Sequence, residues 1–158
     1  MFNFENCIII INLVLRDFFL MLFKNILVPF DNSVISKRAL NKAIALANLT
    51  DAKIILVHVI DYHKAMAKIV GPYKGTMIGH VKKIMDNVKK HASKEKVIVD
   101  TQILYGNPAE EILKLMDKKK FELVVMGRRG TTKITGPSLG SVSNALVQNS
   151  KAPVLVVT

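Results

Sequence analysis

The sequence contains little cysteine, few aromatic residues and a shortage of acidic side chains. Cys7 is the only cysteine among 158 residues, which excludes an internal disulfide and a zinc site built from several cysteines. A reducing, cytoplasmic setting is therefore the default expectation. Aromatic residues make up 6% and apolar residues 50%, which predicts an aliphatic core and excludes disordered and low-complexity chains. Only 12 acidic residues accompany 23 lysines and arginines, so the formal charge of +11 favours partners that carry phosphate.

Long apolar runs are also missing. The run that begins at Cys7 reaches only Leu15 before two charged residues follow, whereas a membrane-spanning helix needs roughly 20 apolar residues. A secretory signal begins with basic residues, but Glu5 is the only charge before this run. Because a second methionine, Met21, precedes the rest of the chain, we expect residues 1–20 to be an extension produced by an upstream start site. The alternative is a genuine N-terminal segment used for packing or membrane contact.

Five short apolar runs alternate with four amphipathic stretches over residues 21–158, where we expect a single domain. Continuous runs of Ile, Val and Leu are typical of parallel strands that are buried on both faces. The predicted strands are 25–29, 54–60, 97–99 with 103–104, 123–126 and 154–157. Apolar residues at helical spacing predict helices within 39–47, 78–88, 109–116 and 142–146.

The β-α alternation predicts the fold class. It indicates one doubly wound α/β domain, with a five-stranded parallel sheet and helices on both faces. In such sheets the ligand crevice lies at the carboxyl ends of the strands, where the strand order reverses. Residues 61–77 contain Gly71, Pro72 and Gly75, and we expect them to form a loop over or beside this crevice. No internal repeat or linker points to a second domain.

Glycines cluster after the fourth apolar run. Gly127 and Gly130 follow this run, and Gly140 with Ser141 opens the last helical stretch, which gives the spacing G-x2-G-x9-G-S. Glycine lets backbone N–H groups approach phosphate oxygens, and a helix N-terminus adds N–H donors and a positive dipole end. The pattern therefore predicts a phosphate cradle, to which Ser143 contributes a hydroxyl group.

Basic residues accompany these glycines. Arg128, Arg129 and Lys133 can add positive charge near a bound phosphate. We expect a β-branched residue at position 130 to enter the phosphate space and to conflict with the backbone angles there. The alternative is that the glycines are ordinary turn and helix-cap residues. Neither the P-loop pattern nor the G-x-G-x-x-G dinucleotide pattern is present.

Four further segments accompany the glycine spacing: 26–31 (ILVPFD), 58–61 (HVID), 106–108 (GNP) and 152–157 (APVLVV). Together with that spacing they resemble the universal stress protein family, in its ATP-binding branch. The resemblance covers residues 21–158. The glycine spacing is highly specific to the ATP-binding branch, whereas the other segments are supportive.

The resemblance implies a Rossmann-like fold of the adenine nucleotide alpha hydrolase type, with ATP bound alone or with Mg²⁺ or Mn²⁺. It implies that the backbone of Val59 meets adenine and that Asp31 lies near adenine or ribose. The residues implied around the adenosine are Pro29, Phe30, Asp31, Val59, Met126 and Gly127. Those implied around the phosphates are Gly127, Arg128, Arg129, Gly130, Thr131, Thr132, Lys133, Gly140, Ser141, Val142 and Ser143.

The chain departs from the family pattern at two places. Phe30 is bulkier than the residue often found before the aspartate, so it is expected to narrow the pocket. Gly136 and Pro137 lie inside the x9 segment and are expected to stiffen or redirect it. Neither departure removes a hydrogen-bond donor that the cradle requires.

Several other polar residues have plain structural explanations. His58 lies within a predicted strand, and we interpret it as structural rather than catalytic. Asp31 could cap the first helix together with its two neighbours as well as contact ribose. The other histidines show no metal-ligand spacing with one another or with Cys7, so we identify no metal site: they are His63, His80 and His91.

We expect a cytoplasmic ATP-binding protein that acts as a regulator or sensor in a stress response, and we identify no catalytic residue. One alternative is a slow ATP hydrolase or nucleotide-transfer enzyme on the same fold, because a held triphosphate needs mainly a placed water molecule. Another is a basic protein associated with nucleic acid. We interpret the lysines in 64–96 and 114–120 as solvated helix faces, since no aromatic residues interleave them for base stacking. Nucleic-acid and membrane partners are therefore not expected.

The last apolar run, 154–157, predicts an assembly. If this strand lies at the edge of the sheet, its outer N–H and C=O groups are open to pairing. Pairing with the same strand of a second copy around a two-fold axis would cover them. Dimers of this kind are also what the family resemblance implies, so we expect a homodimer through this strand.

Overall fold

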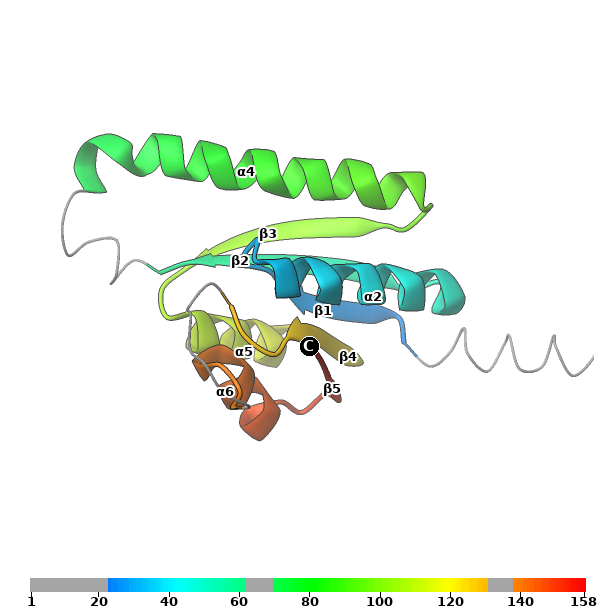
Figure 1. Cartoon of the computed structure of the whole chain (residues 1–158). Helices are drawn as coiled ribbons and strands as arrows, with labels where there is room; N and C mark the ends of the chain where they lie inside the picture. The colour runs from blue at the N-terminus through cyan, green and yellow to red at the C-terminus, as the bar shows by residue number, and fades with distance from the viewer. Residues whose placement is uncertain (1–22, 62–69, 131–137) are drawn as a thin grey trace, which may run out of the picture.

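The computed structural model describes residues 23–61, 70–130 and 138–158 (Figure 1). Within these ranges strands and helices alternate along the chain. The strands are β1 (Asn25–Pro29), β2 (Lys53–Ile60), β3 (Val99–Tyr105), β4 (Leu123–Gly127) and β5 (Val154–Val157). The helices are α2 (Val34–Thr50), α4 (Val70–Lys94), α5 (Pro108–Lys118) and α6 (Ser141–Asn149).

The strands form one parallel sheet in the order β3-β2-β1-β4-β5. The chain first winds outward from β1 to β3 and then crosses to β4 and β5, so the winding direction reverses between β1 and β4. Right-handed crossovers place α2 and α4 on one face and α5 and α6 on the other, as the core contacts and Figure 1 agree. The predicted doubly wound sheet is confirmed.

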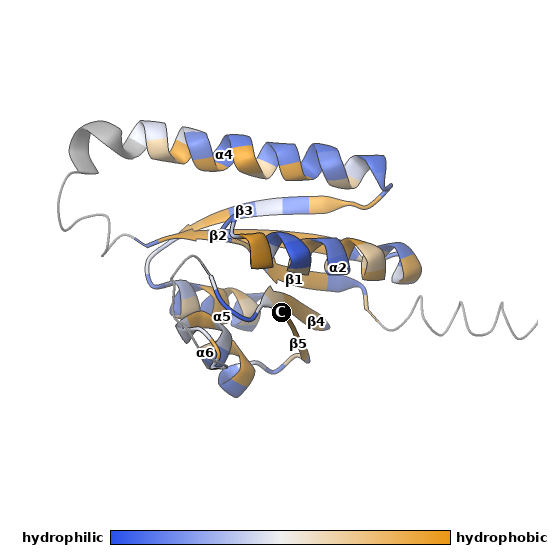
Figure 2. Cartoon of the chain, viewed as in Figure 1, coloured by the Kyte–Doolittle hydropathy of each residue, from blue (hydrophilic) through white to orange (hydrophobic). Residues whose placement is uncertain are grey.

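The continuous apolar runs are explained by two cores, one on each face of the sheet. On β1, Ile26 and Val28 pack into the core with α2 and α4, whereas Leu27 packs into the core with α5 and α6. All three side chains are fully buried. Figure 2 shows the apolar residues gathered on the strands and on the sides of the helices that are turned to them. A strand covered on both faces has no position for an alternating polar residue.

Two expectations about element boundaries are wrong. Residues 70–77 belong to helix α4 and not to a loop. The helix accommodates Gly71 and Pro72 because both fall in its first turn. The N–H groups of a first turn have no partner within the helix, so proline loses no helical hydrogen bond there. The remainder of the expected loop, 62–69, lies outside the described residues. The third strand begins at Val99 instead of Val97, and Ile98 is 66% exposed.

Candidate functional site

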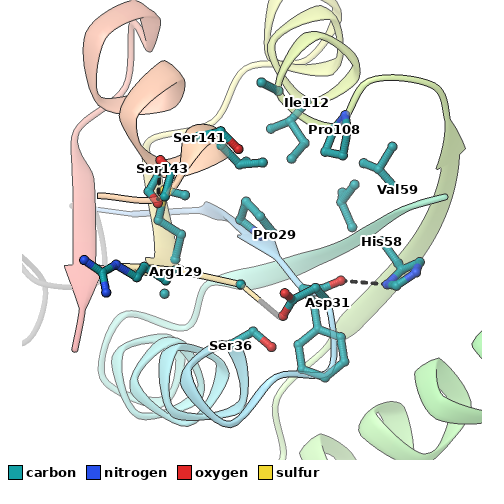
Figure 3. Close-up of a pocket in the computed structure, with 18 of the residues that line it drawn as sticks. Pro29, Asp31, Ser36, His58, Val59, Pro108, Ile112, Arg129, Ser141 and Ser143 are labelled. Carbon is teal, nitrogen blue, oxygen red and sulfur yellow. Dashed lines mark hydrogen bonds between the residues drawn. The ribbon is translucent and has the colours of Figure 1, made fainter. Parts of the chain in front are cut away.

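A cavity of about 700 Å³ opens at the carboxyl ends of β1 and β4, where the winding direction reverses (Figure 3). Its size lies within the range of pockets that hold small organic ligands. Figure 3 shows Pro108, Ile112 and Ser141 on one side of the cavity and Asp31 with Ser36 on the other. The full lining is Pro29, Phe30, Asp31, Ser36, Val57, His58, Val59, Asp61, Asn107, Pro108, Ala109, Ile112, Met126, Gly127, Arg129, Gly130, Gly140, Ser141, Val142 and Ser143.

The turn after β1 brings Asp31 to the cavity wall. Asn32 adopts a left-handed backbone conformation with φ of 65°, which asparagine tolerates better than most residues. Ser33 is the N-cap of α2, and its hydroxyl oxygen accepts a hydrogen bond from the Ser36 N–H at 3.1 Å. Asp31 Oδ1 accepts from the Ser33 N–H at 3.0 Å. The carboxylate is therefore oriented by the start of the helix while it faces the cavity.

Phe30 and His58 support this turn from the side of the sheet. The Phe30 N–H donates to Val57 O at 2.8 Å, and the Phe30 side chain is buried in the core with α2 and α4. Most of its bulk is therefore accommodated by the core, but the residue also lines the cavity, so the expected narrowing of the pocket stays a prediction. His58 Nδ1 lies 2.8 Å from Phe30 O, and since a carbonyl only accepts, Nδ1 carries the proton. The predicted structural role of His58 agrees with this contact, although the residue also lines the cavity.

The glycines after β4 allow close approach between neighbouring segments. A Cβ on Gly127 would lie 2.7 Å from Ile35 Cγ2, at the start of α2. A Cβ on Gly130 would overlap Asp31 Oδ2. Among the described glycines a left-handed φ occurs at Gly106, so the expected backbone constraint at Gly130 is wrong. The requirement at position 130 is space beside Asp31.

The N-terminus of α6 points its donors at the cavity. Gly140 is the N-cap and makes no side-chain capping bond, and the first helical hydrogen bond runs from the Asn144 N–H to Gly140 O at 2.8 Å. The backbone amides of residues 141–143 therefore have no partner within the helix. By contrast, the N-terminal amides of α5 are capped by Asn107, whose side chain accepts from the N–H groups of Ala109 and Glu110. The α6 terminus is the better prepared site for an anion.

Apolar side chains form another part of the lining. Val57 and Val59 come from β2, Met126 from β4, and Pro108 with Ile112 from α5. All of them except Pro108 belong to or pack against the core between the sheet and α5 and α6. An apolar slot beside a group of anion-binding amides suits a ligand with a flat, uncharged ring and a negatively charged tail.

The structure brings the predicted site residues together. All of those that it describes line this cavity, except Arg128. The backbone carbonyl oxygen of Arg128 instead accepts a hydrogen bond from Ser143 Oγ at 2.6 Å. Arg128 Nε is buried and has no hydrogen-bond partner among the described residues. Three predicted residues lie outside the described ranges: Thr131, Thr132 and Lys133.

Sequence reasoning did not assign several lining residues to the site. Asp61 and Asn107 could have been found, because each follows a predicted strand at the carboxyl edge of the sheet. Val57 and Ile112 carry no such signal, since their apolar side chains match a core position equally well. The remaining members of this group are Ser36, Pro108 and Ala109.

Among the described residues, no group of three or more His, Cys, Asp and Glu side chains could hold a metal ion. In the same part of the chain, no helix combines the length and apolar character that are required to cross a membrane.

The fold and the cavity define a doubly wound α/β protein with a candidate ligand site at its switch point. The profile of the universal stress protein family matches residues 22–158, and the chain belongs to this family. Universal stress protein MJ0531 of Methanocaldococcus jannaschii is 36% identical over 144 residues, which cover 86% of this chain and 82% of that relative.

Solved structures agree with this assignment. The structure of hypothetical protein MJ0577, from the same organism, superposes with a TM-score of 0.77 at 32% identity and covers 87% of this chain and 96% of its own. A universal stress protein in complex with cAMP superposes with a TM-score of 0.65 at 25% identity, with coverage of 85% and 96%. The chain therefore spans nearly the whole length of both structures.

Proposed function

We propose that this protein binds ATP in the cavity at the switch point and acts in the cytoplasm as a stress-response regulator whose state depends on the nucleotide. The observation that carries the proposal is the N-terminus of α6, which faces the cavity without a side-chain cap. Phosphate oxygens would accept from its backbone amides and from the hydroxyl group of Ser141, whereas the Ser143 hydroxyl donates to Arg128 O. The complex of a related universal stress protein with cAMP supports an adenine nucleotide as the class of ligand.

The apolar slot would hold the adenine ring. Val59 and Pro108 line the slot and are partly exposed, so a ring placed against them would remove apolar surface from water. Adenine would be read by the backbone groups of Val59, and the ribose would lie near Asp31. This arrangement places the phosphates toward Gly127, Gly130 and the start of α6.

A divalent cation would accompany the triphosphate. Asp31 and Asp61 are the carboxylates of the cavity wall, and carboxylate oxygens are the donors that Mg²⁺ and Mn²⁺ prefer. Asp31 Oδ1 already accepts a hydrogen bond from the Ser33 N–H, so only the remaining lone pairs of this carboxylate would bind a cation. When bound, the cation would neutralise part of the phosphate charge.

The proposal is tested by mass analysis of the small molecules that copurify with the protein, followed by calorimetric titration with ATP and GTP. We expect an adenine nucleotide in the extract and binding of ATP at least several-fold tighter than GTP. The reason is that the loss of a matched hydrogen bond in a buried site costs about 1–3 kcal/mol. The proposal fails if the protein binds neither nucleotide, and equal affinity for both would show that the base is not read.

The regulator hypothesis requires that ATP is held without being consumed. The same preparations are therefore incubated with ATP and Mg²⁺, and ADP release is followed over hours. We expect fewer turnovers than one per protein molecule during the assay. Steady ADP release that disappears in Gly130→Ala would contradict the regulator hypothesis and indicate a slow hydrolase that uses the same site.

A further inference from the structure

We propose that Arg129 is a positioning residue that holds the two arms of the phosphate-binding segment together and thereby sets the affinity for the nucleotide. The first arm comprises residues 127–130 after β4. The second arm comprises residues 138–143 and includes the start of α6. The inference rests on the proposed function, because it concerns how the same site is kept in shape.

Among the described residues, four hydrogen bonds join the two arms, and Arg129 donates two of them. Its Nε donates to Ser138 O at 2.8 Å, and its Nη2 donates to Ser138 Oγ at 3.2 Å. The other two converge on Arg128 O, which accepts from the Gly140 N–H at 3.0 Å and from Ser143 Oγ at 2.6 Å. The arms are therefore joined directly by groups of this chain.

These bonds matter because each arm carries a different part of the site. The first arm lies against the ribose side, since Gly130 leaves room only for the Asp31 carboxylate. The second arm carries the uncapped amides of α6. A shift of one arm relative to the other would separate the phosphate contacts from the ribose contacts, and misplacement of about an ångström is costly in a preorganised site.

The chemistry of the contact requires arginine. The guanidinium group is a planar fork, and here two of its nitrogens donate to the carbonyl and the hydroxyl of one serine. The ammonium of lysine is a single point charge on a flexible stem and does not reproduce this fork. Substitution by lysine therefore keeps the positive charge of Arg129 and removes the planar geometry of its donors.

The first test uses ligand-free protein and the hydrogen exchange of the Gly140 amide. We expect Arg129→Lys and Arg129→Gln both to accelerate this exchange at least severalfold, whereas Arg38→Lys leaves it unchanged. Arg38 is an exposed arginine on α2 and serves as the matched control. Unchanged exchange in both Arg129 variants overturns the inference, whether or not the protein binds nucleotides.

The second test is calorimetric titration of the same folded variants with ATP, together with Ser138→Ala and the double variant Arg129→Gln/Ser138→Ala. Loss of two hydrogen bonds predicts affinity reduced roughly five- to hundredfold in both Arg129 variants. We expect a smaller loss in Ser138→Ala, which keeps the carbonyl acceptor, and no additional loss in the double variant.

The outcomes separate this inference from the proposed function. If lysine at 129 retains the parent affinity while glutamine loses it, Arg129 acts by charge on the phosphates and the positioning role is overturned. Additive losses in the double variant overturn it as well. If the parent itself binds no ATP, the proposed function fails, and the exchange of the Gly140 amide alone decides whether Arg129 joins the arms.

Discussion

Gly127 and Gly130 are required for the space beside them and not for their backbone angles. A Cβ at 127 would meet Ile35, and a Cβ at 130 would meet Asp31. Both neighbours come from the segment that follows β1, which is far from the glycines in sequence. The close approach of this segment to the end of β4 is what forms the floor of the cavity.

Gly130→Ala is expected to weaken ATP binding, because the new methyl group must displace the Asp31 carboxylate. Loss of one well-placed contact predicts a reduction in affinity of roughly five- to hundredfold. Calorimetric titration measures the affinity, and circular dichroism verifies the fold. Parent affinity in a folded Gly130→Ala would contradict the placement of the nucleotide beside this residue.

Gly79 offers a matched contrast within helix α4. It is exposed, it lies in the helix interior, and a Cβ there would meet nothing within 4 Å. Alanine in place of a helical glycine restricts the unfolded chain, so Gly79→Ala should raise the free energy of unfolding by about 0.5–1 kcal/mol. Urea denaturation measures the change, and ATP affinity should remain that of the parent. A lower denaturation midpoint would show that α4 is not a regular helix at this position.

The pairing of β2 with edge strand β3 includes an ion pair that responds to pH. Lys53 Nζ lies 2.5 Å from Asp100 Oδ2, and this hydrogen bond, with the positive charge of Lys53, lowers the pKa of Asp100. A carboxylate whose pKa is lower in the folded than in the unfolded state stabilises the fold at pH values above its pKa in the unfolded state. This stabilisation is lost as the pH falls through the pKa of the folded state.

Asp100→Asn should therefore reduce the free energy of unfolding slightly at pH 7 and have no effect at strongly acidic pH. Both side chains are about half exposed, at 43% and 52%, so we expect a change within about 0.5 kcal/mol. Denaturation of parent and variant at both pH values measures it. Asp86→Asn, which neutralises an exposed carboxylate on α4, controls for the change in net charge. If the difference in free energy of unfolding between parent and Asp100→Asn increases as the pH falls, the proposed role of this ion pair is contradicted.

Among the described strands, β5 forms one edge of the sheet, and none of them pairs with its outer backbone groups. Leu155 on this strand is 40% exposed, and Val147 on the adjoining helix α6 is 46% exposed. We propose that a second copy covers this edge around a two-fold axis, which would bury these apolar side chains as well.

The expected solution mass is that of a dimer at micromolar concentration, and Leu155→Lys should shift it toward the monomer. A buried, unpaired ammonium is strongly unfavourable in an interface. Analytical ultracentrifugation measures the mass, and Ile98→Lys serves as control because Ile98 is an exposed residue just before β3, the opposite edge strand. A monomeric parent would exclude the dimer, and a dimeric Leu155→Lys would place the interface elsewhere.

Local patterns predicted most of the elements, because a buried parallel strand appears as a continuous apolar run and an amphipathic helix as apolar residues at helical spacing. These patterns did not predict the first turn of α4. Glycine and proline usually interrupt helices, but Gly71 and Pro72 occupy the one turn where a missing N–H is harmless. The start of β3 was also misplaced, since Val97 and Ile98 are apolar without belonging to the strand.

The sequence by itself determined the fold class, the strand that leads into the glycine segment and the helix start that follows it. These features depend on residues that are neighbours along the chain. Only the tertiary structure decided which side chains share the cavity: Ile112 meets Val59 there because α5 crosses back over the other face of the sheet. It also decided that Gly130 lies against Asp31 and that Arg129 joins two arms. Such contacts depend on how separate elements pack together, and packing leaves no periodic signal in a single sequence.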